Sequence, residues 1–469
     1  MEETKNTKNT HRYIARVVLK AETGLFIGSG ENSLNNVGLV QRDHWGLPMI
    51  QGTSLTGVIK HALEDGQTDA ENIWRDIFGY QGVTDNDGLG SRLKISSAYL
   101  MIDENSMAEG ITETDEIKKA KNIFDTLPIR QHVNITDKGV AKKTGLFSHE
   151  LVYKGSQFIF EMELKGNESH KDSWDKVLTQ LTEPFFRLGH GTRNGYGKLS
   201  VVSIKQKCFD LKVEKDFDEY LKFNPSLNVK NYNLTELATS TTESNNSIKY
   251  KLELKPDDFF IFSDGLGDEV VNNKPVTESE ITYSTNGIAL SNPKTLIPAS
   301  SIKGALAHRT CFHFNKLNGH YADHGKGTVG TNNQAVKELF GFEASNAEAE
   351  KEVRKRGNVL IDDLYIEDID NTKIFNHVAI DRFTGGAMDG ALFSEQVSHK
   401  KDKKVAFSIT LLKDEYSENA QEAFEEALID VCKGLLPLGG MTTKGHGIFT
   451  GELLRDDESL YKYPKQNKL

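Results

Sequence analysis

Apolar and polar residues alternate along two stretches of the chain, and each stretch ends in a turn that contains glycine. Residues 13–30 read YIARVVLKAETGLFIGSG, and residues 248–265 read IKYKLELKPDDFFIFSDG. A period of two places successive side chains on opposite faces of a strand. Both stretches therefore predict a half-buried β-strand that runs into a turn.

The segments that follow the two strands recur in the same order. Residues 46–64 and 292–310 each predict a short apolar strand, a turn of small residues and an amphipathic helix. Four further pairs follow. A helix closed by Phe-Gly is predicted at 73–80 and 335–342, and a strand at 90–103 and 356–369. Two extended segments around a loop with glycine are predicted at 130–152 and 375–397, and a glycine-rich segment lies at 186–201 and 436–451. One match could arise by chance, but a colinear series indicates an internal duplication.

The duplication predicts two domains, at residues 10–205 and 248–455. Residues 206–247 end in the polar run ATSTTESNNS and are predicted to be a linker. We expect residues 311–335 to be an insertion in the second domain and residues 456–469 to be a tail. Strands and helices do not alternate as regular βαβ units, so the predicted fold class is α+β with antiparallel sheets.

Composition limits the class of protein and its expected location, but it does not change the predicted architecture. The chain of 469 residues is 37% hydrophobic and 27% charged. No apolar run approaches the roughly 20 residues of a membrane span, so we expect no membrane partner. The first twelve residues are polar and unlike a secretory signal. Three scattered cysteines fit a reducing environment, and a cytoplasmic location is expected.

The net charge of −11 argues against a protein that coats duplex DNA through bulk electrostatics. It does not exclude RNA, because a groove can be locally basic on an acidic protein and backbone amides bind phosphate without formal charge. The glycine-rich segments LGHGTRNGYGKL and LGGMTTKGHGIF suggest such a groove. Each has a basic residue, Arg193 or Lys444, before its third glycine. A tight turn between core strands is the alternative interpretation.

Small hydroxyl residues precede the helix of each repeat, in Gly52-Thr53-Ser54 and Ala299-Ser300-Ser301. Such residues cap a helix, and the exposed amides of its first turn can bind an anion. Capping alone would explain the composition. The nearby cations Lys60, Lys303 and Arg309 favour a phosphate site.

The motifs IPASSIKGAL, HVAIDRFTGGAMDGALF and LGGMTTKGHGIF resemble the RAMP superfamily of CRISPR-associated proteins. They are most similar to the repeated backbone subunit of type III effector complexes. A chain with two such units resembles the fused double-backbone subunit of type III-D variants. The first repeat is the looser match, since Gln51 replaces the usual Pro and Thr56 the usual Lys.

The resemblance implies two tandem modified ferredoxin-like (RNA-recognition-type) domains, each with a thumb hairpin, at 130–152 and 375–397. It implies CRISPR guide RNA, complementary target RNA and other RAMP and effector-complex subunits as partners. The RNA-contact candidates, taken together, are Gly52, Thr53, Ser54, Lys60, His132, Arg193, Ser300, Ser301, Lys303, Arg309, His377, Arg382 and Lys444.

Members of this family often cleave the paired target RNA with an Asp in the loop after the first strand, assisted by Mg²⁺ or another divalent ion. The first repeat has Asn35, Asn36 and Val37 there, so we expect no cleavage in that domain. The longer loop of the second repeat, residues 263–291, supplies the candidates Asp264, Asp268 and Glu280.

Two further hypotheses come from histidines. Cys311, His313, His320 and His324 have a spacing that suits a structural Zn²⁺ site, although a polar loop with incidental histidines is the alternative. His44 or His61 could act as the general base of a guide-precursor-processing endoribonuclease of the same superfamily. A non-catalytic assembly subunit is the remaining alternative.

Overall fold

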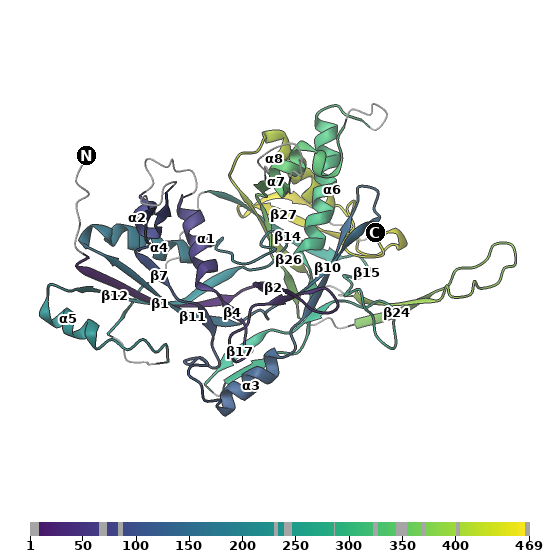
Figure 1. Ribbon diagram of the computed structural model, residues 1–469. Coiled ribbons are helices and arrows are strands. Elements are labelled where there is room, and N and C mark those ends of the chain that lie inside the picture. The colour runs from purple at the N-terminus through teal and green to yellow at the C-terminus, as the bar shows by residue number, and fades with distance from the viewer. Residues whose placement is uncertain are drawn as a thin grey trace.

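The computed structural model describes residues 9–64, 73–82, 88–228, 233–238, 246–285, 287–321, 327–343, 354–367, 371–399 and 404–464. The chain forms two halves, each with its own hydrophobic core. Figure 1 shows the halves side by side, the N-terminal one in purple and blue and the C-terminal one in green and yellow.

The first half is built on an antiparallel sheet in which β12, β1, β11 and β7 lie in that order. Helices α1 and α4 follow the first and third of these strands along the chain. This order of a βαββαβ unit is that of a ferredoxin-like fold. The elements are β1 His11–Ala21, α1 Gly52–Glu64, β7 Leu93–Ile95, β11 Gln157–Gly166, α4 Lys171–Thr182 and β12 Leu199–Asp210.

The second half repeats this topology, with β27, β14, β26 and β22 in the same order. Tyr250, Leu252 and Leu254, at alternate positions of β14, are buried as the period of two predicts. The elements are β14 Ser247–Pro256, α6 Ala299–Leu317, β22 Val359–Ile361, β26 Val405–Leu412, α8 Glu418–Cys432 and β27 Phe449–Arg455. The predicted α+β fold of two tandem ferredoxin-like domains is confirmed.

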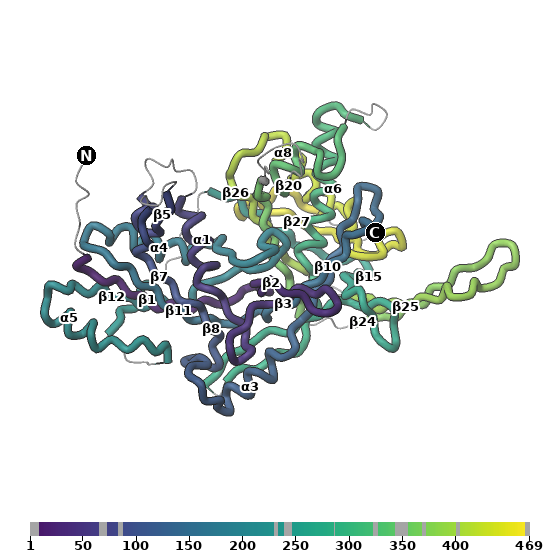
Figure 2. The backbone as a smooth tube through the Cα atoms, in the orientation of Figure 1, coloured from purple at the N-terminus to yellow at the C-terminus, as the bar shows by residue number. Residues whose placement is uncertain are grey.

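A hairpin is inserted between the second and third strands of each sheet. The first hairpin consists of β9 (Ile129–Ile135) and β10 (Ala141–Glu150), and the second of β24 (Asn371–His377) and β25 (Phe393–His399). The second hairpin projects from the body as a long arm (Figures 1 and 2). The first hairpin lies toward the second half. Its strand β10 also pairs in parallel with β3 (Val37–Val40) of the first half.

The remaining elements cover the sheets or extend their edges. They are β2 Gly28–Asn32, β4 Met49–Ile50, α2 Trp74–Phe78, β5 Tyr80–Gln81, β6 Gly88–Leu89, β8 Ala98–Leu100, α3 Asp115–Phe124, α5 Glu214–Leu221, β13 Thr235–Glu236, β15 Phe259–Phe260, β16 Thr277–Glu278, β17 Ile281–Ser284, β18 Gly287–Leu290, β19 Lys294–Ile297, α7 Gln334–Phe340, β20 Gly341–Glu343, β21 Arg354–Arg356, β23 Leu364–Ile366 and β28 Glu458–Lys462, with 3-10 turns at Glu168–His170, Gly330–Asn332 and Thr442–Lys444.

Three predicted boundaries differ from the structure. Strand β12 continues past residue 206 to Asp210, and β13 pairs with it, so the first half includes most of the predicted linker. Strand β28 pairs with β27, so the predicted tail extends the second sheet. Helix α6 continues to Leu317, so Cys311 and His313 belong to a helix and not to the insertion. In each case polar composition masked a regular element.

None of the helices within the described residues has both the length and the apolar character needed to cross a membrane.

Candidate RNA-binding site at the joint between the halves

The two halves meet at a joint centred on Arg130 of β9. Its guanidinium donates to Glu278 at 2.6 and 2.9 Å and pairs with Asp363, and all three side chains are buried. The Tyr196 ring lies 5.0 Å from the guanidinium. Burial alone would lower the pKa of Arg130, but Asp363 and Glu278 raise it well above its usual range. The joint is therefore a compensated buried ion network.

Further ion pairs surround this centre. Asp362 pairs with Arg187 and, at 2.7 Å, with Lys198 of the first half. Lys154 of the first half lies 2.6 Å from Glu280, which also pairs with Lys294 at 3.0 Å. Glu280 is thus a partly buried ion-pair partner, and its catalytic role stays a prediction.

The first glycine-rich loop packs against the start of α6. A Cβ on Gly195 would lie 2.5 Å from the Cβ of Ala299, so only glycine fits there. The amide of Ala299 donates to Asp363 at 2.8 Å. The close approach that Gly195 allows is therefore made to the second half of the same chain.

Two cations face one another across this contact. Arg193 Nε donates to the Gly357 carbonyl at 2.6 Å, and Lys303 Nζ to Asn194 at 3.3 Å. Burial, then the charges of Arg356 and Arg187, lowers the pKa of Arg193 to about 10. Burial, then Arg193, lowers the pKa of Lys303 to about 8. We call Arg193, Lys303 and Arg356 the joint cation cluster.

Two members of the joint cation cluster have only cations as the charged groups that shift their pKa values. Within the described parts of the chain, no carboxylate lies at ion-pair distance from Arg193 or Lys303. Ser300 and Ser301 lie in the first turn of α6, one turn or less from Lys303, and Ser301 is exposed. The positive end of the helix dipole adds to the cluster. An anion bound here would relieve the mutual repulsion of the cations.

Two predicted RNA contacts are bonded to other side chains of the protein, one of them buried and the other partly exposed. His132 is buried and bonded to the Tyr196 hydroxyl, and burial followed by the charge of Arg130 lowers its pKa to about 4. Arg309 pairs with Asp430 of α8 at 2.6 Å, and so does His313 at 2.7 Å. Both side chains therefore have partners within the protein, and the assignment of His132 and Arg309 as direct RNA contacts stays a prediction.

The corresponding helix of the first half offers a weaker site. A Cβ on Gly52 would lie 2.4 Å from the Ile95 carbonyl, so packing against β7 explains this glycine. Thr53 is exposed and Ser54 half-buried at the start of α1, while Lys60 lies 3.8 Å from Glu64 on the same helix. The roles of Thr53, Ser54 and Lys60 in RNA binding stay predictions.

A pocket of about 520 Å³ lies at the base of the second hairpin, between that hairpin and the second glycine-rich loop. His377 and Lys444 both line it, and Lys444 Nζ lies 5.4 Å from the Phe393 ring. Beneath it, buried Glu395 accepts from His377 at 2.7 Å. Arg382 is exposed farther along the arm. The structure thus brings together two of the predicted RNA contacts.

The acidic loop of the second half carries the other two catalytic candidates. Lys274 Nζ lies 3.9 Å from Asp264 and 3.4 Å from Asp268. Amides of Val270 and Val271 hold the pKa of Asp268 below its usual range. A Cβ on Gly265 would lie 2.8 Å from the Gln131 side chain of β9. The loop therefore lies directly beside the first hairpin.

The predicted zinc ligands are not assembled in the described residues. Cys311 donates to the Thr328 carbonyl at 3.3 Å, whereas His313 is bonded to Asp430. His324 lies outside the described residues. No group of three His, Cys, Asp or Glu residues in the described ranges is placed to hold a metal. A zinc site formed by all four residues stays a prediction.

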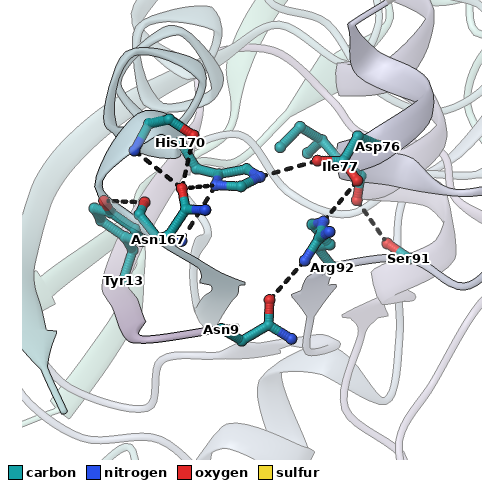
Figure 3. Close-up of polar contacts among 9 residues, drawn as sticks. Asn9, Tyr13, Asp76, Ile77, Ser91, Arg92, Asn167 and His170 are labelled. Atoms are coloured by element: carbon teal, nitrogen blue, oxygen red, sulfur yellow. Dashed lines mark hydrogen bonds and ion pairs between the residues drawn. The ribbon is translucent and has the colours of Figure 1, made fainter. Parts of the chain in front are cut away.

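A histidine–carboxylate pair elsewhere in the first half is structural. His170 Nε2 lies 2.9 Å from Asp76, which accepts from Arg92 at 2.7 Å, while Asn167 bonds both His170 and Tyr13 (Figure 3). Ser91 donates to backbone carbonyls. The network ties α2 to β7, β1 and the start of α4.

The two histidines considered as the general base for guide-precursor processing do not lie in a common site: one is hydrogen-bonded to the backbone and the other is exposed. His44 Nε2 lies 3.1 Å from the Gly110 carbonyl, and His61 is exposed in the last turn of α1. Among the described residues, no hydrogen bond pairs either imidazole with another acid–base side chain. Nothing in their surroundings favours the processing hypothesis.

Sequence reasoning missed Arg130, Asp362 and Asp363. A signal was available in the apolar strand segment VLIDDLYI, where an acidic pair occupies the place of Ser96 and Ser97 in the first repeat. Two adjacent carboxylates in an otherwise apolar segment indicate a buried cationic partner. The sequence gives no indication that this partner lies in the other half.

The fold and the joint define a protein of two ferredoxin-like domains, each with an inserted hairpin and a glycine-rich loop. The family model of the RAMP superfamily matches residues 18–200 and 288–450. These regions make up most of the chain, which therefore belongs to the RAMP superfamily.

The solved structures that are similar to this chain include the following two. One is a chain of Type III-B Cmr-beta in the apo state, with 18% identity and a TM-score of 0.29. The other is a chain of Type III-B Cmr-beta bound to cognate target RNA, with 17% identity and a TM-score of 0.30. Each match covers 40% of this chain and 96% of the other. No curated protein matches the chain.

Proposed function

We propose that the chain is a guide-RNA-binding backbone subunit of a type III CRISPR effector complex. The observation that carries the proposal is the joint cation cluster, in which burial and like charge lower the pKa values of Arg193 and Lys303. A phosphodiester at the start of α6 would supply the missing negative charge. Guide RNA would thus run across the joint and contact both halves.

Removing one of these cations tests the proposal. Lys303→Met should weaken binding of guide RNA by the full chain about tenfold and reduce the salt dependence by about one phosphate contact. Lys316→Met is the matched control, because Lys316 is exposed in the last turn of the same helix. Equal affinities of Lys303→Met and the wild type in a salt titration would contradict guide binding at the joint.

We also propose that the second half cleaves target RNA at the acidic loop. Lys274 marks a position where a cation lies within 4 Å of both Asp264 and Asp268, and hard divalent ions prefer such carboxylate oxygens. A divalent ion bound there would polarise the phosphate. Asp268 is the preferred group because its side chain is 41% exposed, against 20% for Asp264.

The acidic loop and the first hairpin together would position the scissile linkage. Gln131 of β9 lies next to Gly265, so the loop and the hairpin would form one continuous surface beside the RNA. An RNA nucleotide displaced by the hairpin could let its 2′-hydroxyl approach the adjacent phosphorus in line.

Incubating the assembled complex with labelled complementary RNA and Mg²⁺ tests this second proposal. Asp268→Ala should abolish the cut and preserve target binding. Asp414→Ala, in an exposed turn away from the loop, should cleave normally. A cut that survives in both Asp268→Ala and Asp264→Ala would refute the assignment, and a complex that binds without cutting would leave the non-catalytic assembly role.

A further inference from the structure

The duplication places an equivalent group of three side chains at the base of each hairpin. Position by position, the first trio is His132, His149 and Tyr196, and the second trio is His377, Glu395 and His446. The register of the two hairpins fixes the first two correspondences, and the third member lies between the last two glycines of each glycine-rich loop. The trios differ in charge, because the first has no carboxylate and the second contains buried Glu395.

His149 of β10 lies in surroundings that suit only an uncharged ring. Its imidazole stacks on Phe26, with 4.4 Å between the ring centroids, and a Cβ on Gly38 of β3 would lie 2.8 Å from its Nδ1. Both ring nitrogens are buried and have no hydrogen-bond partner among the described residues. The neighbouring Glu150 accepts from the Val40 amide at 3.2 Å and not from the ring. A positive charge on His149 would therefore be buried without an acceptor.

The titratable groups around His149 also favour the uncharged ring. Arg130 of β9 lies opposite His149 in the hairpin register, and β3 (VGLV) has no titratable side chain. The ring centroids of His132 and His190 lie 6.2 and 5.6 Å from that of His149. Tyr196, whose pKa is raised by burial, is bonded to His132 and is neutral. Burial, then Arg130, lowers the pKa of His132 to about 4. Burial, then His190, lowers the pKa of His149.

The second trio provides for a charged histidine. Glu395 Oε1 lies 2.7 Å from His377 Nε2 and 3.4 Å from His446 Nε2, and the Glu395 side chain is fully buried. A positive charge on either histidine would lie beside a carboxylate, which favours the charged form. Acid should therefore affect the two hairpins differently, although their positions in the two halves are equivalent.

We propose that the first hairpin is a pH-dependent element, in which β10 stays on β3 only while His132 and His149 are uncharged. Acid releases β10 from β3 and from Phe26, whereas the second hairpin keeps its structure. The joint stays closed, because its ion network does not include these histidines. Ser148 of β10 pairs with Gln131, the residue beside the acidic loop, so release changes the surface next to that loop. Only the effect on cleavage rests on the proposed function.

The direction of the response follows from the lowered pKa values. The folded hairpin binds fewer protons than the released one, so its attachment is fully stable above the usual histidine pKa of 6.5 and weakens as the pH falls below that value. For His132 this loss continues down to about pH 4. Each histidine makes release about tenfold more favourable per pH unit in its range.

Hydrogen exchange of the full chain at pH 7.5 and 5.0 tests the proposal, with each protection factor referred to the intrinsic exchange rate at that pH. The amides of residues 146–150 in β10 should lose protection at least about tenfold at pH 5.0. The amides of β25 and β1 should keep their protection, which distinguishes local release from unfolding of the chain. Equal protection of β10 at both pH values, or a loss shared by β1, would overturn the proposal. Because the assay contains no RNA, its failure is distinct from failure of guide binding.

Variants of the two trios identify the groups responsible. His149→Phe keeps a ring against Phe26 and cannot be charged, so β10 should lose less protection at pH 5.0 than in the wild type. His61→Gln, at an exposed site of α1, is the matched control and should leave the loss unchanged. Glu395→Gln is the converse variant, and it should make β25 lose protection at pH 5.0 as β10 does. A full wild-type loss in His149→Phe, or a β25 that stays protected in Glu395→Gln, would contradict the proposal.

Discussion

At the scale of single residues, Lys303 is the group whose chemistry most directly reports on RNA binding. Its pKa of about 8 means that the amine is charged below pH 8 and loses its proton above it. A bound phosphate favours the charged form and would raise this pKa. We expect guide affinity to fall as pH rises from 7 to 9, by up to tenfold per unit above pH 8.

Fluorescence anisotropy at pH 7, 8 and 9 would measure this dependence. Lys303→Arg keeps the charge throughout this range and should bind with little change in affinity, whereas Lys303→Met should bind weakly at every pH. A wild-type affinity that does not vary with pH would show that Lys303 stays away from the phosphate.

Arg130 governs stability and not RNA affinity. Arg130→Ala leaves Glu278 and Asp363 as buried charges without a cation, so we expect a loss of about 3–5 kcal/mol in the free energy of unfolding. Arg382→Ala, on the exposed arm, should change it by less than about 0.5 kcal/mol. Denaturant unfolding of both variants would measure the two free energies. Comparable stabilities of the two variants would contradict a stabilising role of the Arg130 ion network.

At the scale of elements, the second hairpin extends away from the body and should be dispensable for folding. Ile380 and Phe383 are exposed in its outer part, and Phe383 is 85% exposed. Replacing residues 379–390 with a short glycine linker should leave the melting temperature unchanged and reduce the protection of bound RNA from nucleases. A large drop in melting temperature would indicate that the arm belongs to the core.

The sequence predicted the secondary-structure elements better than the contacts between them. Period-two alternation located β1 and β14, and the repeat yielded the ferredoxin-like topology twice. Arg193 and Lys303 were singled out from the sequence as RNA contacts, but no local pattern shows that they meet across the joint. Arg130 was missed because its acids lie 148 and 233 positions away along the chain. Ion pairs between residues far apart along the chain produce no periodic pattern in the sequence.

At the scale of the whole molecule, the joint should hold the halves together without a covalent link. Strands β17 and β18 of the second half also pack on the first core, where Ile281 is buried. A chain with a protease site inserted between Ala238 and Asn246 should remain one particle after cleavage, even at high salt, because buried pairs are poorly screened. The same cleaved chain with Arg130→Ala should separate on gel filtration, and coelution of that variant would contradict the expectation.

The ion network at the joint also has a consequence for the order in which the chain is made. Domains fold as units while synthesis proceeds from the N-terminus. The first half can complete its sheet once β13 has left the ribosome. Arg130 then has no ion-pair partner, because Glu278 and Asp363 are synthesised much later. For that interval the nascent protein exposes Arg130, Lys154, Arg187 and Lys198 as an unneutralised basic edge. A ribosome-bound first half should therefore adhere to nucleic acid in a way that the finished protein does not.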